Sequence, residues 1–131
     1  MKYHNPILRG FNPDPSICRV GEDYYMVTST FEYFPGIPVY HSRDLINWEQ
    51  IGNCIERAEQ LDFSGVKSSG GIWAPVIRYE DGLFYVTATF SEKGNFIVTS
   101  RNPAGGWSDP VWTDFDGIDP SIFFEDGEMY Y

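Results

Sequence analysis

The chain has 131 residues, of which 42% are hydrophobic and 18% aromatic, which is enough apolar material for a folded core and excludes a disordered tail. Nineteen Asp and Glu against nine Lys and Arg give a formal net charge of -10, which argues against nucleic acid and anionic membrane surfaces as partners. The chain contains no apolar run of signal-peptide or membrane-spanning length, so we expect a cytoplasmic protein.

The first predicted unit covers about residues 14–52 and begins with the motif DPSI at residues 14–17. An acidic, Gly-bearing segment at residues 21–23 favours a tight β-turn. Residues 26–30 and 38–41 are dense in β-branched and aromatic side chains, which is typical of strands. We therefore predict that this unit contains four short strands.

The connection after the first unit shows little regular pattern. Ile55, Ala58 and Leu61 are the only apolar residues with helical spacing, which predicts a single helical turn or no helix. Residues 64–71 are rich in Ser and Gly and are expected to form a flexible connection.

A second unit, about residues 74–113, repeats the order of the first with APVI at residues 74–77. A third unit begins at about residue 119, again with DPSI, and both later units have an acidic turn with Gly. The units start 60 and then 45 residues apart, which is near the blade length of β-propellers and far from helical solenoids. We therefore predict an all-β propeller; a β-sandwich and an open barrel, which also use many short strands, are the alternatives.

The first two units also end alike. Trp48 follows the motif HSRD, and Trp107 follows the related motif TSRN. Their recurrence at blade ends predicts a role in the core between blades for both side chains. Arg43 and Asp44 are expected to form a turn and a surface ion pair with little catalytic meaning.

The third unit reaches Tyr131 in the middle of its predicted hairpin. A propeller buries each blade against two neighbours, so two blades and a fraction leave apolar faces and strand edges uncovered. We therefore expect this chain to be a fragment of a longer protein, or to need another chain to complete it.

Asp14 and Asp119 occupy the same place in their units, whereas the second unit has Ala74 there. A proline follows each of them, which predicts an extended conformation for the preceding residue. The first strand of each propeller blade lines the central channel, so both carboxylates would project into one funnel, where paired carboxylates suit glycoside hydrolysis. The alternative is that each Asp only caps the start of a strand through an Asx turn.

Four motifs in the right order resemble the glycoside hydrolases of family 43. They are NPDPSI at residues 12–17, SRDL at 42–45 followed by Trp48, GIWAP at 71–75 and DPS at 119–121. A further segment, FEYFPG at residues 31–36, looks like the β-xylosidase branch of the family. The resemblance covers nearly the entire chain.

The resemblance implies a five-bladed β-propeller, of which this chain covers roughly the first two blades and the start of the third. It further implies an inverting β-xylosidase that releases xylose from the ends of xylo-oligosaccharides. Asp14 would be the general base, Asp119 would tune the pKa of the acid, and the acid itself, a Glu, would lie beyond residue 131. The isolated chain would then be inactive. The alternatives are an α-L-arabinofuranosidase of the same family and a sugar-binding propeller without catalysis.

Trp73 and Phe31 are the candidate substrate-binding residues, because the resemblance makes them platforms for a sugar ring. Their positions near strand ends would let both of them rim the funnel. The alternative for both is ordinary packing of large aromatic side chains between blades.

No cofactor is required by this reading. Cys18 and Cys54 are expected to be free thiols, and neither pairs with His4 or His41 at zinc-ligand spacing. No metal ligands are assigned, although the family resemblance allows a divalent cation such as calcium in the central channel. The expected partner is a small oligosaccharide, and a homo-oligomer is left open.

Overall fold

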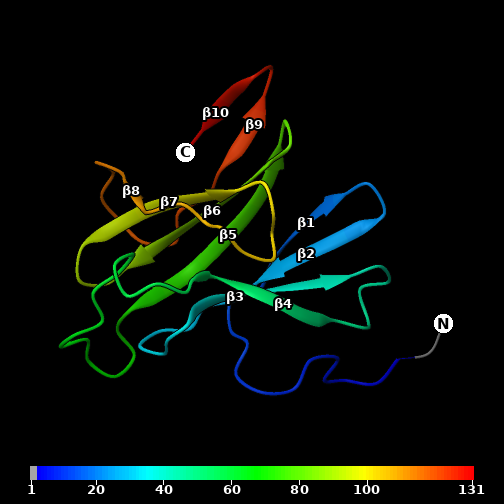
Figure 1. Ribbon diagram of the computed structural model, residues 1–131, viewed down its shortest axis with the longest axis horizontal. Coiled ribbons are helices and arrows are strands. Elements are labelled where there is room, and N and C mark those ends of the chain that lie inside the picture. Colours follow the sequence, from blue (N-terminus) through cyan, green and yellow to red (C-terminus); the bar gives the residue numbers. More distant parts are fainter. Residues whose placement is uncertain (1–2) are drawn as a thin grey trace.

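The computed structural model describes residues 3–131 and contains only strands, turns and loops over that range (Figure 1). One four-stranded antiparallel sheet has the order β1-β2-β3-β4, and another has the order β5-β6-β7-β8. A two-stranded hairpin, β9-β10, follows. The strands are β1 (Ser16–Val20), β2 (Asp23–Val27), β3 (Gly36–Ser42), β4 (Glu49–Ile55), β5 (Ile72–Glu80), β6 (Leu83–Phe90), β7 (Gly94–Ser100), β8 (Val111–Trp112), β9 (Phe123–Glu125) and β10 (Glu128–Tyr130). The prediction of four strands in each of the first two units is confirmed.

Each unit opens with a hairpin whose turn has the predicted chemistry. In the turn between β5 and β6, Asp81 and Gly82 have φ of 47° and 79°. Asp126 and Gly127, between β9 and β10, have φ of 52° and 79°. Two consecutive residues with positive φ match the right-handed twist of the flanking strands, and Asp and Gly tolerate this conformation best.

The segment with helical spacing, residues 55–61, forms no helix but ends in turns. Gln60 folds back in this segment, and its side-chain oxygen accepts hydrogen bonds from the backbone N–H groups of Glu56 and Arg57, both at 3.0 Å. Within residues 3–131, no helix is long and apolar enough to cross a membrane.

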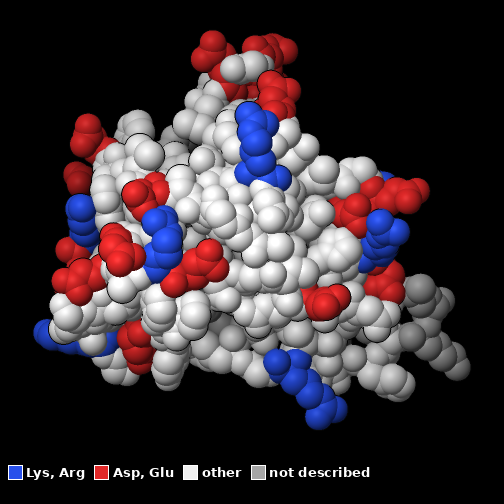
Figure 2. All heavy atoms as spheres, viewed as in Figure 1, with Lys and Arg blue, Asp and Glu red and all other residues white. Residues whose placement is uncertain are grey.

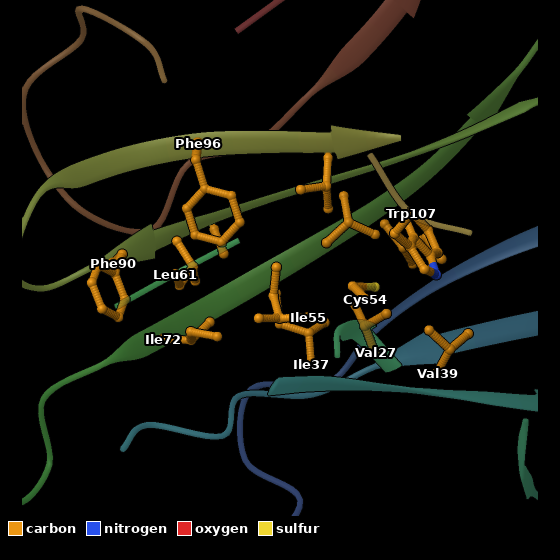
Figure 3. Packing of buried hydrophobic residues seen from close by; sticks show 14 of the residues in the cluster. Val27, Ile37, Val39, Cys54, Ile55, Leu61, Ile72, Phe90, Phe96 and Trp107 are labelled. Carbon is orange, nitrogen blue, oxygen red and sulfur yellow. The ribbon is translucent and has the colours of Figure 1, made fainter. Parts of the chain in front are cut away.

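The main hydrophobic core lies between the two four-stranded sheets (Figure 3). On β6 every second side chain, from Phe84 to Phe90, points into this core, as the period of two in a strand requires. Ile37 and Val39 of β3 meet them from the first sheet. Trp107 is 3% exposed and packs in the same core, as predicted.

The outer face of each sheet is covered differently. Residues of the third unit cover the second sheet: the rings of Tyr85 and Phe124 lie 4.9 Å apart, and the hydroxyl of Tyr131 lies 3.1 Å from that of Thr87. The N-terminal segment lies along the first sheet and leaves a groove of about 650 Å³. Trp48 lines this groove and lies outside the core between the two sheets, and its predicted inter-blade role stays a prediction.

The expected turn at Arg43 and Asp44 is present, but the expected surface ion pair between them is wrong. Arg43 Nε donates to Asp23 Oδ1 at 2.9 Å, and His41 Nε2 lies 2.7 Å from the same oxygen. Asp44 Oδ1 instead accepts the N–H groups of Ile46 and Asn47, at 2.9 and 2.7 Å. These bonds orient the carboxylate of Asp44 toward its own turn, so it does not pair with the guanidinium of Arg43.

Cys18 and Cys54 are free thiols, as predicted. Burial raises the pKa of the Cys18 thiol to about 11, and that of the fully buried Cys54 well above its usual value. Both thiols therefore stay protonated near neutral pH and behave as small hydrophobic side chains.

Candidate active site

The three residues that open the units share an unusual backbone conformation. Asp14, Ala74 and Asp119 have φ of 53°, 39° and 59°, each directly before a proline. The prediction of an extended conformation at these positions is wrong. Positive φ is strained for residues other than Gly and persists only where the surroundings over-determine it. Because Ala74 shares it, the conformation does not depend on an Asp side chain.

A buried serine holds the carboxylate of Asp14. Ser29, which follows β2 and is fully buried, donates its hydroxyl proton to Asp14 Oδ2 at 2.6 Å. The backbone N–H of Ser29 donates to Pro13 O at 2.9 Å, which fixes the segment of Asp14 a second time. Asp14 itself is exposed, so its carboxylate is both fixed in place and open to water.

The same serine joins the first unit to the second. The backbone N–H of Ala74 donates to Ser29 Oγ at 2.7 Å. Ala74 lies in β5, which packs beside β1, so the start of the second unit is tied to the carboxylate-bearing start of the first.

A threonine plays a related part between the second unit and the third. The backbone N–H of Asp119 donates to Thr89 Oγ1 at 3.2 Å, and Thr89 is 3% exposed. In the ladder of β5 and β6, Thr89 stands opposite Trp73. Asp119 is therefore tied to the residue that pairs with Trp73, whereas its carboxylate is exposed to solvent.

Phe31 reaches the start of β5 through a bridge outside the named strands. Its N–H donates to Ile72 O, and the N–H of Ile72 donates to Phe31 O, both at 3.0 Å. Gly71 allows this close approach, because a Cβ at Gly71 would lie 2.1 Å from the carbonyl oxygen of Phe31. Phe31 therefore lies beside the strand that carries Trp73.

The aromatic side chains here are partly open to solvent. Trp73 is half-buried, and its indole N–H donates to Ser69 O at 2.9 Å, which fixes the ring. The ring of Phe31 packs against that of Phe11 at 5.7 Å, and Phe11 packs against Tyr33 at 5.9 Å. Phe11 and Tyr33 are 61% and 60% exposed, so this cluster presents flat apolar rings of the kind that pack against sugars.

The four residues singled out in the sequence are thus connected through the beginning of β5. Trp73 lies in β5, and Phe31 bridges to Ile72 of the same strand. Asp14 is linked to β5 through Ser29, which binds the backbone of Ala74. Asp119 is linked through Thr89, which pairs with Trp73. Ser29 and Thr89 were not singled out from the sequence. The repeat alignment contains the signal for them, since both are hydroxyl residues twelve positions after the Ile of their unit, Ile17 and Ile77.

Charge on the described surface is mostly acidic. Figure 2 shows Asp and Glu side chains gathered at the tip over β9 and β10 and along both sides of the molecule. Among residues 3–131, no three His, Cys, Asp or Glu side chains come together in an arrangement that could hold a metal ion. The divalent cation that the family resemblance allows in the central channel stays a prediction, and no chemical step is assigned to it.

Comparison with known proteins covers almost the whole chain. A family model described as glycosyl hydrolases family 43 matches residues 3–131. A non-reducing end α-L-arabinofuranosidase of Bacteroides ovatus is 57% identical over 98% of this chain and 25% of its own length. A xylosidase/arabinosidase of Butyrivibrio fibrisolvens is 54% identical over 98% of this chain and 26% of its own length. The chain thus spans about a quarter of the length of these curated relatives.

The solved structures give the same picture. The crystal structure of a xylan β-1,4-xylosidase from Bacillus halodurans matches with a TM-score of 0.92 and 47% identity, over 98% of this chain and 26% of that one. With two four-stranded sheets and a hairpin in this likeness, the prediction of an all-β propeller, represented by two blades and the start of a third, is confirmed.

Proposed function

This chain belongs to family 43 of the glycosyl hydrolases, and on that basis we propose that the protein carrying it is an inverting β-xylosidase. It would release xylose from the ends of short xylo-oligosaccharides. The observation that carries the proposal is the carboxylate of Asp14, which is exposed to water and held by a buried serine that also binds the backbone of Ala74, the residue after Trp73.

In this proposal Asp14 is the general base. An inverting glycosidase needs one carboxylate to take a proton from the attacking water and a carboxylic acid to protonate the departing oxygen. The two groups stand about 6.5–9.5 Å apart, so that water fits between them and the sugar. A carboxylate fixed through one oxygen and open to solvent suits the base, because its second oxygen is free to meet that water.

Asp119 is proposed to support the acid, a Glu expected beyond residue 131. An ionised Asp near that Glu raises the pKa of the Glu through like-charge repulsion, so the Glu stays protonated near neutral pH. Trp73 and Phe31 are proposed to contact the sugar. The indole N–H of Trp73 is bonded to Ser69 O, and the backbone of Phe31 is bonded to Ile72 while its ring packs against Phe11, so both side chains would meet the substrate largely ordered.

The proposal is tested in the complete protein that carries this chain. Asp14→Asn keeps the size of the side chain but removes the base, so kcat on 4-nitrophenyl β-xyloside should fall about 10²- to 10⁴-fold. The anomer of the released xylose, followed by NMR, should be inverted relative to the substrate. Near-normal turnover by Asp14→Asn would end the assignment of this residue as the base.

An α-L-arabinofuranosidase is the second candidate. It is favoured by the name of the Bacteroides ovatus relative, which shares 57% identity with this chain. Parallel assays on 4-nitrophenyl α-L-arabinofuranoside decide between the two. A sugar-binding propeller without catalysis is the third, and sugar binding by a wild-type protein that turns over neither substrate would favour it. The cytoplasmic location and the absence of nucleic-acid and membrane partners stay predictions.

A further inference from the structure

The hydroxyl of Ser29 has only one arrangement of its hydrogen bonds. A hydroxyl carries one proton and two lone pairs. The backbone N–H of Ala74 is purely a donor, so Ser29 Oγ must accept there, at 2.7 Å. Its single proton is then directed to Asp14 Oδ2 at 2.6 Å. The result is a polarised chain from the Ala74 amide through Ser29 to the carboxylate, and each link strengthens the next.

This chain of hydrogen bonds determines which carboxylate oxygen can react. Asp14 Oδ2 accepts a short, charge-assisted hydrogen bond from a fully buried side chain. Oδ1 is therefore the oxygen left to receive a proton from water. Without the Ser29 hydroxyl the exposed carboxylate could rotate and turn either oxygen in any direction.

Thr89 shows what the same position does without a carboxylate. It accepts the N–H of Asp119, as Ser29 accepts that of Ala74, but its proton goes to Asn95 Oδ1 at 2.6 Å. The second unit has Ala74 where the first has Asp14, so Thr89 has no carboxylate of its own unit to hold. Both hydroxyls thus accept a backbone N–H from the next unit, but only the hydroxyl of Ser29 also holds a carboxylate.

We propose that Ser29 is a positioning residue for the reaction, which orients the carboxylate of Asp14 so that Oδ1 faces the attacking water. This inference rests on the proposed function, in which Asp14 is the general base. Ser29 does not touch the reacting atoms; it acts only through Asp14.

The test compares variants of the complete protein on whichever glycoside the wild type hydrolyses. Ser29→Ala should lower kcat about 10- to 100-fold and leave KM within about twofold, because misplacing the base weakens the chemical step and leaves sugar binding intact. Ser29→Thr should keep kcat within about threefold of wild type, since Thr89 shows that this place in the repeat accommodates a threonine. Loss of kcat in Ser29→Thr equal to that in Ser29→Ala contradicts the proposal.

Thr28→Val is the matched control. Thr28 is the neighbouring residue, fully buried like Ser29, and its hydroxyl has no hydrogen-bond partner among the described residues. Removing it should leave kcat unchanged, which shows that the loss of a buried hydroxyl in this segment is not enough to affect turnover. A decrease in kcat equal to that of Ser29→Ala would assign the effect to packing and overturn the proposal.

A double variant separates positioning from stability. Ser29→Ala also leaves the Ala74 N–H without its acceptor, so the folded state loses stability as well. In an Asp14→Asn background, however, Ser29→Ala should lower the residual kcat by less than about twofold, because there is no base left to orient. The same fold-decrease in both backgrounds contradicts the proposal.

The outcomes distinguish the inference from the function it rests on. If Asp14→Asn lowers kcat as predicted while Ser29→Ala leaves kcat at the wild-type value, only the role of Ser29 is wrong. If Asp14→Asn retains turnover, the proposed base is wrong and the inference fails with it. Should Ser29→Ala not fold, Ser29→Cys, whose thiol is a much weaker donor, carries the same expectation of a reduced kcat with unchanged KM; an unchanged kcat overturns it.

Discussion

At the scale of single residues, short hydrogen bonds fix the positions of three carboxylates. One oxygen of Asp23, in β2, accepts hydrogen bonds from Arg43 and His41. Asp44 accepts backbone N–H groups of its own turn, and Asp14 accepts the hydroxyl of Ser29. These three acidic side chains thus have different roles: Asp23 joins two strands, Asp44 caps a turn, and Asp14 belongs to the candidate active site.

The contact of Asp23 predicts a pH dependence of stability. The hydrogen bond from His41, and then that from Arg43, hold the pKa of Asp23 below its ordinary value of 3.8. A lowered pKa in the folded state means that the stabilisation is present above the ordinary pKa and is lost as pH falls through the lowered one. Melting temperatures of the complete protein, measured between about pH 5 and pH 2, should therefore fall less steeply for Asp23→Asn than for wild type. Parallel curves for the two proteins would contradict this role of Asp23.

At the scale of elements, the start of β5 is the point where the two sheets and the site meet. Phe31, from the loop after β2, bridges to Ile72, and the register of β5 against β6 shifts between Trp73 and Val76. The residue before this strand, Gly71, has φ of 86° and lies against the carbonyl of Phe31. The sheet is thus irregular just where its residues serve the site, as β-bulges often are.

Gly71→Ala should disrupt this junction. An alanine at this position would have to adopt a positive φ, which is strained for a residue with a Cβ. That Cβ would also overlap the carbonyl oxygen of Phe31, 2.1 Å away. Gly65→Ala is the control, because Gly65 has φ of 79° but open space around it. We expect the control to lose about 1–2 kcal/mol of unfolding free energy and Gly71→Ala to lose about 1–3 kcal/mol more. Equal losses in denaturant unfolding of the complete protein would show that the approach of Phe31 is not tight.

At the scale of the whole molecule, the core between the two sheets contrasts with the open surfaces of the third unit. Val86, Val98 and Phe96 are fully buried between the sheets. The hairpin β9-β10 extends beyond the second sheet in Figure 1, and Phe123, Met129 and Tyr130 are 58%, 46% and 55% exposed there. In a propeller such side chains pack against strands of their own and the next blade.

Residues 1–131 expressed alone should therefore be inactive. The proposed general acid is expected beyond residue 131, and without it the leaving oxygen is not protonated. The measurement is turnover of 4-nitrophenyl β-xyloside and 4-nitrophenyl α-L-arabinofuranoside by the isolated chain, with the complete protein as the positive control. Turnover by a homogeneous preparation of the isolated chain would show that the acid lies within it.

The sequence by itself determined the repeat of four-stranded units, the acidic hairpin turns and the family. These depend on local signals: side chains alternate with a period of two along a strand, and Asp-Gly pairs favour positive φ. Motif order then identified Asp14, Asp119, Trp73 and Phe31 as candidates without stating what holds them.

Only the tertiary structure decided those contacts. The hydrogen bond from Ser29 to Asp14 joins residues 15 apart, that from Ala74 to Ser29 joins residues 45 apart, and Arg43 finds Asp23 across 20 residues. It also showed a positive φ before the prolines, against the local preference for an extended chain. A local pattern carries no information on which distant polar groups share a buried site, and the arrangement of this candidate active site consists of such pairs.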